Sequence, residues 1–387
     1  MFDDCIIMAG GEGTRLWPAS NSKKQKQFLS AGGSVSAASS SGGKGSFFGA
    51  ALERAFASTG RDGRVIIIAG GSHIESVIEV AMAFDDAQRR RMILIRESEA
   101  KNTAPAILAG VLYSGLSTGG AHPERSILVL TSDHIIGPLP VFAEDAAAAS
   151  VFAAKGKLVV FGISPSRPET GYGYIETAGT LASQMPASPE AAAFNVASFR
   201  EKPGRAEAED FCAAGNFYWN SGMFGFSAEG ILEEYRINAP LLYEAFKDLK
   251  APNDGDYENF RGLRLLSQWQ GLAEAYRRVQ GISFDYAIAE KAQNTVMIRS
   301  RFDWKDVGNW DEYAALPEAQ KAAGNEVFSV YSKNCFVDSE IPVALAGVED
   351  LIVVVRNGAL LIVRKGRTQY VKDVVEEIKK AGRTDIL

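Results

Sequence analysis

The chain has 387 residues, of which 46% are hydrophobic and 23% are charged, and its formal net charge is -6. These proportions are ordinary for a folded globular protein. Chains beyond roughly 250–300 residues tend to divide into domains, so we expect one large domain and a smaller one. The modest negative charge, without blocks of like charge, argues against a nucleic-acid or membrane-surface partner.

The cysteines and histidines show neither a disulfide framework nor the spacing of a metal site. They are few and scattered, at Cys5, Cys212, Cys335, His73, His122 and His134. The N-terminal sequence MFDDCIIMAGG carries two acids where a secretory signal would be basic. No apolar run approaches the roughly 18 residues that span a bilayer. We therefore expect a cytoplasmic protein with no membrane partner.

The first half of the chain alternates short apolar runs with helical patterns. The expected strands are apolar throughout, and they are Cys5–Met8, Val65–Ala69, Met92–Ile95, Ser126–Leu130 and Lys157–Gly162. Helices are expected at Ile74–Phe84 and Ala104–Leu116. Fully apolar strands suit a parallel sheet covered on both faces. The alternation predicts an α/β fold with a doubly wound, mainly parallel, Rossmann-like sheet, whose ligands bind at the carboxyl ends of the strands.

Two domains are expected from the change in character along the chain. Residues 1–316 form the first, which contains a Gly/Ser-rich insert at about 31–46, typical of a surface loop. Residues 317–387 read as short strands followed by a helix at Val371–Ala381. We therefore predict a small β-rich C-terminal domain attached to the larger one.

The strongest signal is the sequence AGGEGTRLWP at residues 9–18, directly after the first expected strand. Closely spaced glycines let backbone N–H groups approach an anion without interference from a Cβ atom. Arg15 in this segment offers a forked cation to phosphate oxygens. A dinucleotide-binding loop is the main rival, but its fingerprint needs a third glycine where Leu16 stands. This segment, called the glycine loop below, is a candidate phosphate-binding site.

Further motifs follow along the chain: KQFL from Lys26, NTAPA from Asn102, SDH from Ser132, PETGYGY from Pro168, EKP from Glu201, WNSGMF from Trp219, SFDYA from Ser283 and WKDVGNW from Trp304. With the glycine loop, their order and spacing over about residues 1–316 resemble the sugar-phosphate nucleotidyltransferases, with a weaker likeness in the tail. The tryptophan of the glycine loop and the NTAPA and WNSG stretches favour the guanylyltransferase branch, which uses GTP and mannose 1-phosphate.

The resemblance implies in-line attack of a sugar-phosphate oxygen on the α-phosphorus of a nucleoside triphosphate, with Mg²⁺ as cofactor and pyrophosphate leaving. Arg15 and Lys26 are the implied cations on the triphosphate, and Asp133 and Asp306 the implied Mg²⁺ ligands. The other nucleotide-binding candidates are Ala9, Gly10, Gly11, Gly13, Thr14, Asn102 and Thr103. The sugar-phosphate candidates are Gly173, Glu201, Lys202, Asn220 and Ser221. Catalysis of this kind depends on positioning and charge neutralisation.

These residues also have purely structural interpretations. An aspartate after a strand is often a turn or helix cap, which would suit Asp133 and Asp306, and Lys202 would then be a solvated surface charge. We expect His134 to orient its loop, and the tryptophans of the motifs to pack rather than bind ligand. Gln25 stands where the family has proline before the lysine of KQFL, which leaves the placement of that lysine open.

Other functions stay open on the sequence. The pocket residues could serve a different sugar 1-phosphate or base, or the chain could be a non-catalytic regulatory relative that binds nucleotide sugar. Retention of both cations and both aspartates argues against the regulatory alternative. The tail is too short for the cupin-type isomerase domain of many bacterial relatives, so we expect no isomerase activity. The oligomeric state is open, with a homodimer as one arrangement.

Overall fold

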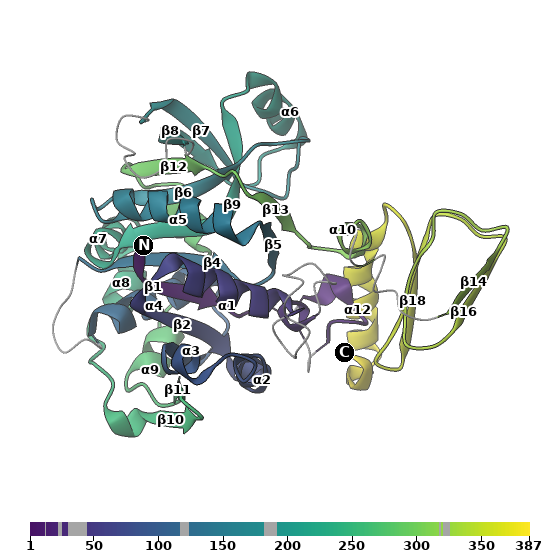
Figure 1. The fold of residues 1–387 in the computed structure, drawn as a ribbon, viewed down its shortest axis with the longest axis horizontal. Helices are drawn as coiled ribbons and strands as arrows, with labels where there is room; N and C mark the ends of the chain where they lie inside the picture. Colours follow the sequence, from purple (N-terminus) through teal and green to yellow (C-terminus); the bar gives the residue numbers. More distant parts are fainter. Residues whose placement is uncertain are drawn as a thin grey trace.

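The computed structural model describes residues 1–11, 13–21, 25–29, 45–116, 124–181, 192–316, 319 and 326–387. A body built around one large sheet lies beside a β-rich C-terminal segment, with α10 (Trp310–Ala314) and α12 (Val371–Lys380) between them (Figure 1). The expected insert at about 31–46 falls mostly outside the described residues. Its last residue, Ser46, does not belong to a loop, because its side chain accepts the Gly49 N–H and caps the helix that begins at Phe47.

The main sheet has eleven strands in the order β10-β11-β3-β2-β1-β4-β9-β6-β12-β8-β7. Their bounds are β1 Phe2–Met8, β2 Thr59–Gly70, β3 Met92–Glu97, β4 Ser126–Thr131, β6 Leu158–Ile163, β7 Tyr174–Thr180, β8 Ala192–Arg200, β9 Phe217–Ser227, β10 Tyr257–Phe260, β11 Leu263–Leu266 and β12 Thr295–Arg299. A separate pair joins β5 (His134–Gly137) to β13 (Asp303–Asp306). The five strands expected from apolar runs are thereby confirmed.

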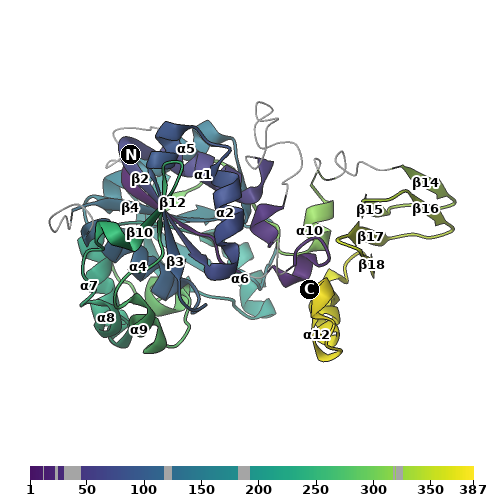
Figure 2. The same cartoon turned by 90° about the horizontal axis from the view of Figure 1, so that it is seen from below.

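Helices cover both faces of the main sheet (Figure 2). Ile6 of β1 belongs to an apolar cluster that includes residues of α4, α7, α8 and α9, and Cys5 and Ile7 belong to another that includes residues of α1, α2 and α5. The bounds are α1 Phe47–Ser58, α2 Ile74–Ala81, α3 Asp86–Arg90, α4 Thr103–Leu116, α5 Leu139–Ala153, α6 Arg205–Ala214, α7 Ala228–Asn238, α8 Pro240–Phe246 and α9 Leu272–Arg277. Because the central strands are buried on both faces, they contain long apolar runs, such as CIIM in β1 and VIIIA in β2.

The expectation of a mainly parallel sheet is wrong for part of this sheet. β11, β3, β2, β1 and β4 run parallel to one another, as do β6 and β12. β9 runs antiparallel to both β4 and β6, and β7, β8 and β10 also have antiparallel neighbours. An apolar run indicates that a strand is buried on both faces, but it carries no information about direction. Direction follows from the chain connections, and β9 is not among the strands that the apolar runs predict.

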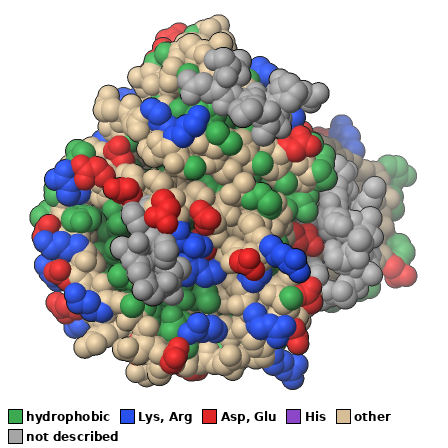
Figure 3. Space-filling model, turned by 60° about the vertical axis from the view of Figure 1, so that its left-hand side comes forward, with side chains coloured by type: hydrophobic (Ala, Val, Ile, Leu, Met, Phe, Trp, Pro, Cys, Tyr) green, Lys and Arg blue, Asp and Glu red, His purple; other side chains and the backbone are tan. Residues whose placement is uncertain are grey.

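Two observations describe the surface of this molecule. Acidic and basic side chains are interspersed among the described residues on the face shown in Figure 3, so that neither sign dominates this face. Among the described residues, every helix is too short or too polar to cross a bilayer.

The C-terminal segment forms the short strands and final helix that the sequence predicts. The strands are β14 Val327–Val330, β15 Phe336–Ser339, β16 Val343–Ala346, β17 Leu351–Arg356 and β18 Ala359–Arg364. β14 pairs in parallel with β16, and β15 with β17, so successive turns of a coil lie on one another, while β18 is antiparallel to β17. Trp17 and Trp310 of the body share one apolar cluster with Ile352 and Val371 of this segment. A domain boundary at residue 316 therefore stays a prediction.

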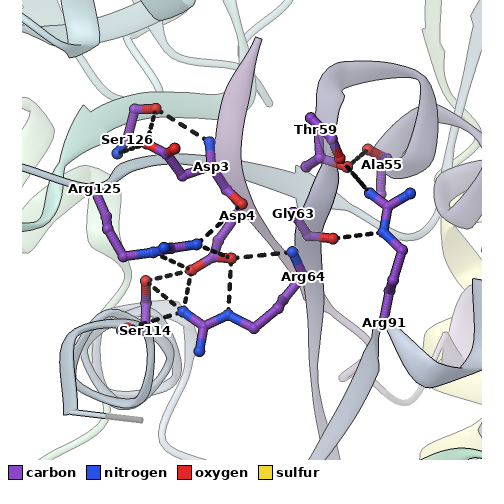
Figure 4. A network of polar contacts seen from close by, with 11 residues as sticks. Asp3, Asp4, Ala55, Thr59, Gly63, Arg64, Arg91, Ser114, Arg125 and Ser126 are labelled. Carbon is purple, nitrogen blue, oxygen red and sulfur yellow. Dashed lines mark hydrogen bonds and ion pairs between the residues drawn. The ribbon is translucent and has the colours of Figure 1, made fainter. Parts of the chain in front are cut away.

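At the end of the sheet where β1 begins, one buried carboxylate accepts hydrogen bonds from side chains of several elements (Figure 4). Asp4 is fully buried. Arg64 donates to Asp4 through Nε at 3.0 Å and Nη2 at 2.5 Å, Arg125 donates through Nε at 3.0 Å and Nη2 at 2.8 Å, and Ser114 Oγ donates at 2.6 Å. Burial alone would raise the pKa of Asp4, but the hydrogen bonds and charges of the two arginines hold it below its ordinary value. One carboxylate thus joins β1, β2, α4 and the residue that precedes β4.

Replacing Asp4 by asparagine should lower the free energy of unfolding by about 3 kcal/mol at pH 7, because two arginines lose their shared buried partner. The low pKa of Asp4 means that its contribution is present above the unfolded-state pKa and is lost as the pH falls through the lower folded-state pKa. The difference between the proteins should therefore shrink below about pH 4. Urea unfolding measures both effects. Asp86→Asn removes an ion pair with Arg89 whose carboxylate is exposed, and it should change stability by less than about 0.5 kcal/mol. An equal loss in both variants would contradict the interpretation.

Candidate active site

The glycine loop leaves the carboxyl end of β1 and packs directly against the KQFL segment. Gly11 and Gly13 have φ values of 107° and 59°, in the left-handed region that favours glycine. A Cβ atom on Gly13 would lie 2.6 Å from the Cβ atom of Lys26, so this close approach excludes any other residue. Ser20 Oγ donates to the Gly13 carbonyl at 2.6 Å and holds the loop in place. The structure therefore brings the glycine loop and Lys26 together.

Thr14, Arg15 and Leu16 form one turn of 3₁₀ helix. Leu16 and Trp17 are buried, whereas the Arg15 side chain is exposed. Gln25, which replaces the family's proline, has φ of -78°, within the range that a proline ring would impose. The backbone before Lys26 thus keeps a proline-compatible conformation without proline.

Lys26 lies between two carboxylates that are far apart in the sequence. Its Nζ atom donates to Asp133 Oδ2 at 2.8 Å and to Asp306 Oδ1 at 3.2 Å. The antiparallel pairing of β5 with β13 places His134 opposite Asp306 and so delivers both aspartates to one point. Burial alone would lower the pKa of Lys26, but the two carboxylates raise it above its ordinary value. Burial would raise the pKa of Asp133, but Lys26 and then His134 lower it to about 2.

The sequence analysis expects His134 to orient its loop, and the structure also places this residue beside both carboxylates. Its Nε2 atom lies 3.7 Å from Asp133 Oδ1 and 3.8 Å from Asp306 Oδ1. Its Nδ1 atom is 3.2 Å from the indole Nε1 of Trp304 and 2.7 Å from Thr131 Oγ1. Because an indole N–H can only donate, Nδ1 accepts and the ring proton sits on Nε2, facing both carboxylates. Burial lowers the pKa of His134, which favours this neutral form.

The same three residues are a candidate metal site. Asp133, His134 and Asp306 each offer a ligand atom, and these atoms lie within 4.8 Å of one another. Mg²⁺ prefers oxygen ligands and commonly takes one or two carboxylates with phosphate oxygens and water. The carboxylate pair fits such an ion. His134 Nε2 faces the two carboxylates at 3.7 and 3.8 Å, beyond hydrogen-bond distance. A cationic group, Lys26 Nζ, already lies between the two carboxylates, as expected of a position with strong negative potential.

Most of the sugar-phosphate candidates form a second cluster beside β9. Its members are Gly173, Glu201, Lys202 and Asn220. The Asn220 N–H donates to the Gly173 carbonyl at 2.8 Å, and a Cβ atom on Gly173 would lie 2.5 Å from Glu201 Oε2. Lys202, at φ of 48°, donates to Glu201 Oε1 at 2.7 Å. Ser221 is buried and accepts the Met223 N–H at 3.4 Å, so its part in ligand binding stays a prediction.

Asp285 completes this second cluster, although the sequence interpretation gave it no role. Asn220 Nδ2 donates to Asp285 Oδ1 at 2.8 Å. Burial, and then the negative charge of Glu201, raise the pKa of Asp285 to about 6. The SFDYA motif could have indicated this residue, because Asp285 is the one charged residue in it.

Asn102 and Thr103 lie at the start of α4. Asn102 has φ of 66°, and its Oδ1 atom accepts the Thr103 N–H at 2.8 Å. Thr103 Oγ1 accepts the Phe284 N–H at 2.8 Å, next to Asp285. Thr103 therefore links the N-terminus of α4 to the segment that carries the second cluster. Contact of these two residues with a nucleotide stays a prediction.

The chain is similar to known proteins along nearly its whole length. A family model described as nucleotidyl transferase matches residues 4–322, and one described as MannoseP isomerase/GMP-like beta-helix domain matches residues 325–378. The chain is 33% identical to the xanthan biosynthesis protein XanB of Xanthomonas campestris pv. campestris (strain B100) over 390 residues, which cover 98% of this chain and 74% of the relative. It is also 33% identical over 392 residues to a mannose-1-phosphate guanylyltransferase of Escherichia coli (strain K12), with the same coverage.

One solved structure is similar along nearly the whole chain. A crystal structure from Thermus thermophilus, described as a mannose-1-phosphate geranyltransferase, superposes with a TM-score of 0.75 at 26% identity. The match covers 98% of this chain and 100% of that chain. It therefore includes both the body and the β-rich C-terminal segment, whose coiled strands fit the matched beta-helix model.

Replacing Lys26 by methionine tests whether its ammonium group keeps the pKa of Asp133 low. Without the ammonium group, Asp133 and Asp306 repel each other, so the pKa of Asp133 should rise from about 2 toward its ordinary 3.8 or above. A ¹³C NMR titration of the aspartate carboxyl carbons measures this change. Lys305→Met removes an exposed lysine on the strand of Asp306 and should leave the pKa of Asp133 low. An unchanged Asp133 in the Lys26 variant would show that Lys26 does not set its charge.

Proposed function

The chain belongs to the nucleotidyl transferase family, and on that premise we propose that it transfers GMP from GTP to mannose 1-phosphate. The products are GDP-mannose and pyrophosphate. The observation that carries the proposal is the carboxylate pair around Lys26, placed against a glycine loop at the carboxyl edge of the sheet. The likeness to mannose-1-phosphate guanylyltransferases along 98% of the chain supports the choice of substrates.

The reaction needs no covalent intermediate on the protein. A phosphate oxygen of mannose 1-phosphate attacks the α-phosphorus of GTP, a new P–O bond forms, and the bond to the β-phosphate oxygen breaks as pyrophosphate leaves. Charge accumulates on the phosphate oxygens during this exchange, so catalysis relies on alignment and on positive charge. This chain supplies such charge through side chains whose positions the fold determines.

Lys26 and Arg15 are the proposed cations on the triphosphate. Lys26 is buried and held at a defined point by two carboxylates, so its ammonium group is preorganised rather than freely rotating. Arg15 is exposed on the adjoining loop, where its fork can reach phosphate oxygens. Asp133 and Asp306 would hold Mg²⁺, which when bound neutralises triphosphate charge. His134 lies beside both carboxylates, and its ring is held by Thr131 and Trp304.

The second cluster is the proposed mannose 1-phosphate site. Glu201 and Asp285 are hydrogen-bond acceptors for sugar hydroxyls, and the Asn220 amide, which already bonds Asp285, orients that carboxyl group. Lys202 is half exposed, with a side chain 54% accessible, and is the proposed partner of the sugar phosphate. The absence of a Cβ atom at Gly173 lets Glu201 approach the backbone there.

We also propose a cytoplasmic location and, for the oligomeric state, a homodimer. The free state of all three cysteines supports a reducing compartment. Sedimentation of the purified protein tests the oligomeric state.

A substrate panel tests the proposed activity. GTP with mannose 1-phosphate should give the highest kcat/KM among four nucleoside triphosphates, each paired with mannose, glucose and galactose 1-phosphates. Pyrophosphate release is the measurement. A clear preference for UTP, CTP or dTTP would overturn the base assignment, and a preference for another sugar would overturn the choice of mannose. Nucleotide binding without pyrophosphate release from any pair would favour a regulatory protein.

Replacing Asp133 or Asp306 by asparagine should lower kcat by roughly 10²-fold or more, about 2.7 kcal/mol, with a smaller effect on KM. Asparagine keeps the size and one oxygen but loses the charge that attracts a hard cation. If each aspartate only caps a turn, stability should fall by ~1 kcal/mol with turnover near normal. Steady-state rates over a Mg²⁺ series and melting temperatures distinguish these outcomes. Asp303→Asn, on an exposed position of the same strand, is the control.

A further inference from the structure

The C-terminal segment, residues 326–387, contacts both loops that carry the proposed catalytic groups. Figures 1 and 2 show α12 and α10 lying between the coiled strands and the body. Leu16 and Trp17 of the glycine loop are buried in one apolar cluster with Val371 and Val375 of α12. This burial places the segment behind the turn that presents Arg15.

Two hydrogen bonds also join the C-terminal segment to the glycine loop. Asn357, in the turn between β17 and β18, donates from Nδ2 to the Pro18 carbonyl at 2.8 Å. Trp17 Nε1 donates to the Ile386 carbonyl at 2.7 Å. Both bonds end on the residues that directly follow Arg15 and Leu16, so they hold the C-terminal end of the glycine loop.

A second set of bonds reaches the loop that follows Asp306. The Thr368 hydroxyl lies 2.6 Å from Asp311 Oδ2 and 3.1 Å from Asn309 Oδ1, and the Gly366 N–H donates to Asp311 Oδ1 at 2.8 Å. Asn309 Oδ1 in turn caps α10 by accepting the Asp311 and Glu312 N–H groups at 2.9 and 3.1 Å. The segment therefore holds the chain three residues beyond Asp306.

The two loops are also joined to each other. Trp310 is fully buried, and its Nε1 atom donates to the Trp17 carbonyl at 2.8 Å. Each loop is thus connected to the other and, separately, to the C-terminal segment. A simple appended module would need only one of these connections, and it would not need buried polar bonds to both loops.

We propose that the C-terminal segment braces the active site, and that Asn357 and Thr368 are positioning residues for the glycine loop and the Asp306 loop. The inference rests on the proposed function for its meaning in catalysis. Misplacing reacting groups by about 1 Å can cost roughly 10²-fold in rate, so a brace that fixes the distance between a phosphate-binding arginine and a metal carboxylate has a direct effect on turnover.

The first test compares two asparagines of the same segment. Asn357 and Asn334 both have φ of 53°, so glycine keeps either backbone conformation. Asn357→Gly removes the bond to Pro18 of the glycine loop, whereas Asn334→Gly removes bonds to Asp350 and Lys365 inside the segment. Asn357→Gly should raise KM for GTP about 10-fold and speed amide hydrogen exchange in residues 13–21. Asn334→Gly should do neither, at a similar change in melting temperature.

The second test concerns the other loop. Thr368→Val preserves shape and removes the hydroxyl, and it should raise the half-saturating Mg²⁺ concentration several-fold and speed hydrogen exchange in residues 306–313. Ser332→Ala, which removes a hydroxyl bonded to the Val330 carbonyl within the segment, is the control. If both test variants match their controls in exchange, KM and Mg²⁺ dependence, the brace is refuted. A wild-type protein that turns over no substrate pair rejects the proposed function instead, while hydrogen exchange still decides on the brace.

Discussion

One ammonium group between two carboxylates ties together three distant stretches of this chain. Lys26 belongs to the segment after the glycine loop, Asp133 to the link between β4 and β5, and Asp306 to β13. A buried lysine is stable in its charged form only beside compensating charge, and two aspartates at one point need a cation between them. Each group therefore depends on the others, and the arrangement creates the strongly negative position that a hard cation prefers.

The sheet supplies the distances on which this interaction depends. Parallel β1 and β4 end at the same edge, so the glycine loop and the Asp133–His134 pair leave it side by side. The short β5–β13 pairing adds Asp306 at that edge. The antiparallel β9 then carries Asn220 next to the same edge, opposite β6 and β7. The opposite edge serves stability, since Asp4 gathers two arginines there.

The C-terminal segment bears on the proposed catalysis through its contacts with the body. Its coiled strands are short and partly exposed, and several apolar side chains of β14 and β18 face solvent. The segment contacts the body through hydrogen bonds of Asn357 and Thr368 and through the apolar face of α12. A module of this kind can act on catalysis without supplying a group that touches substrate.

The sequence by itself determined the local parts. Apolar runs located the central strands, the glycines located a loop with left-handed backbone, and the ordered motifs indicated the family and nearly all of the residues that cluster. These features are local, because burial, backbone freedom and motif spacing are written in neighbouring residues. The tertiary structure alone decided the direction of β9, the position of His134 beside both carboxylates, the entry of Asp285 beside Glu201, and the placement of Lys26 between its aspartates. Each of these depends on contacts between residues far apart in the chain, and no local pattern encodes which distant groups will meet.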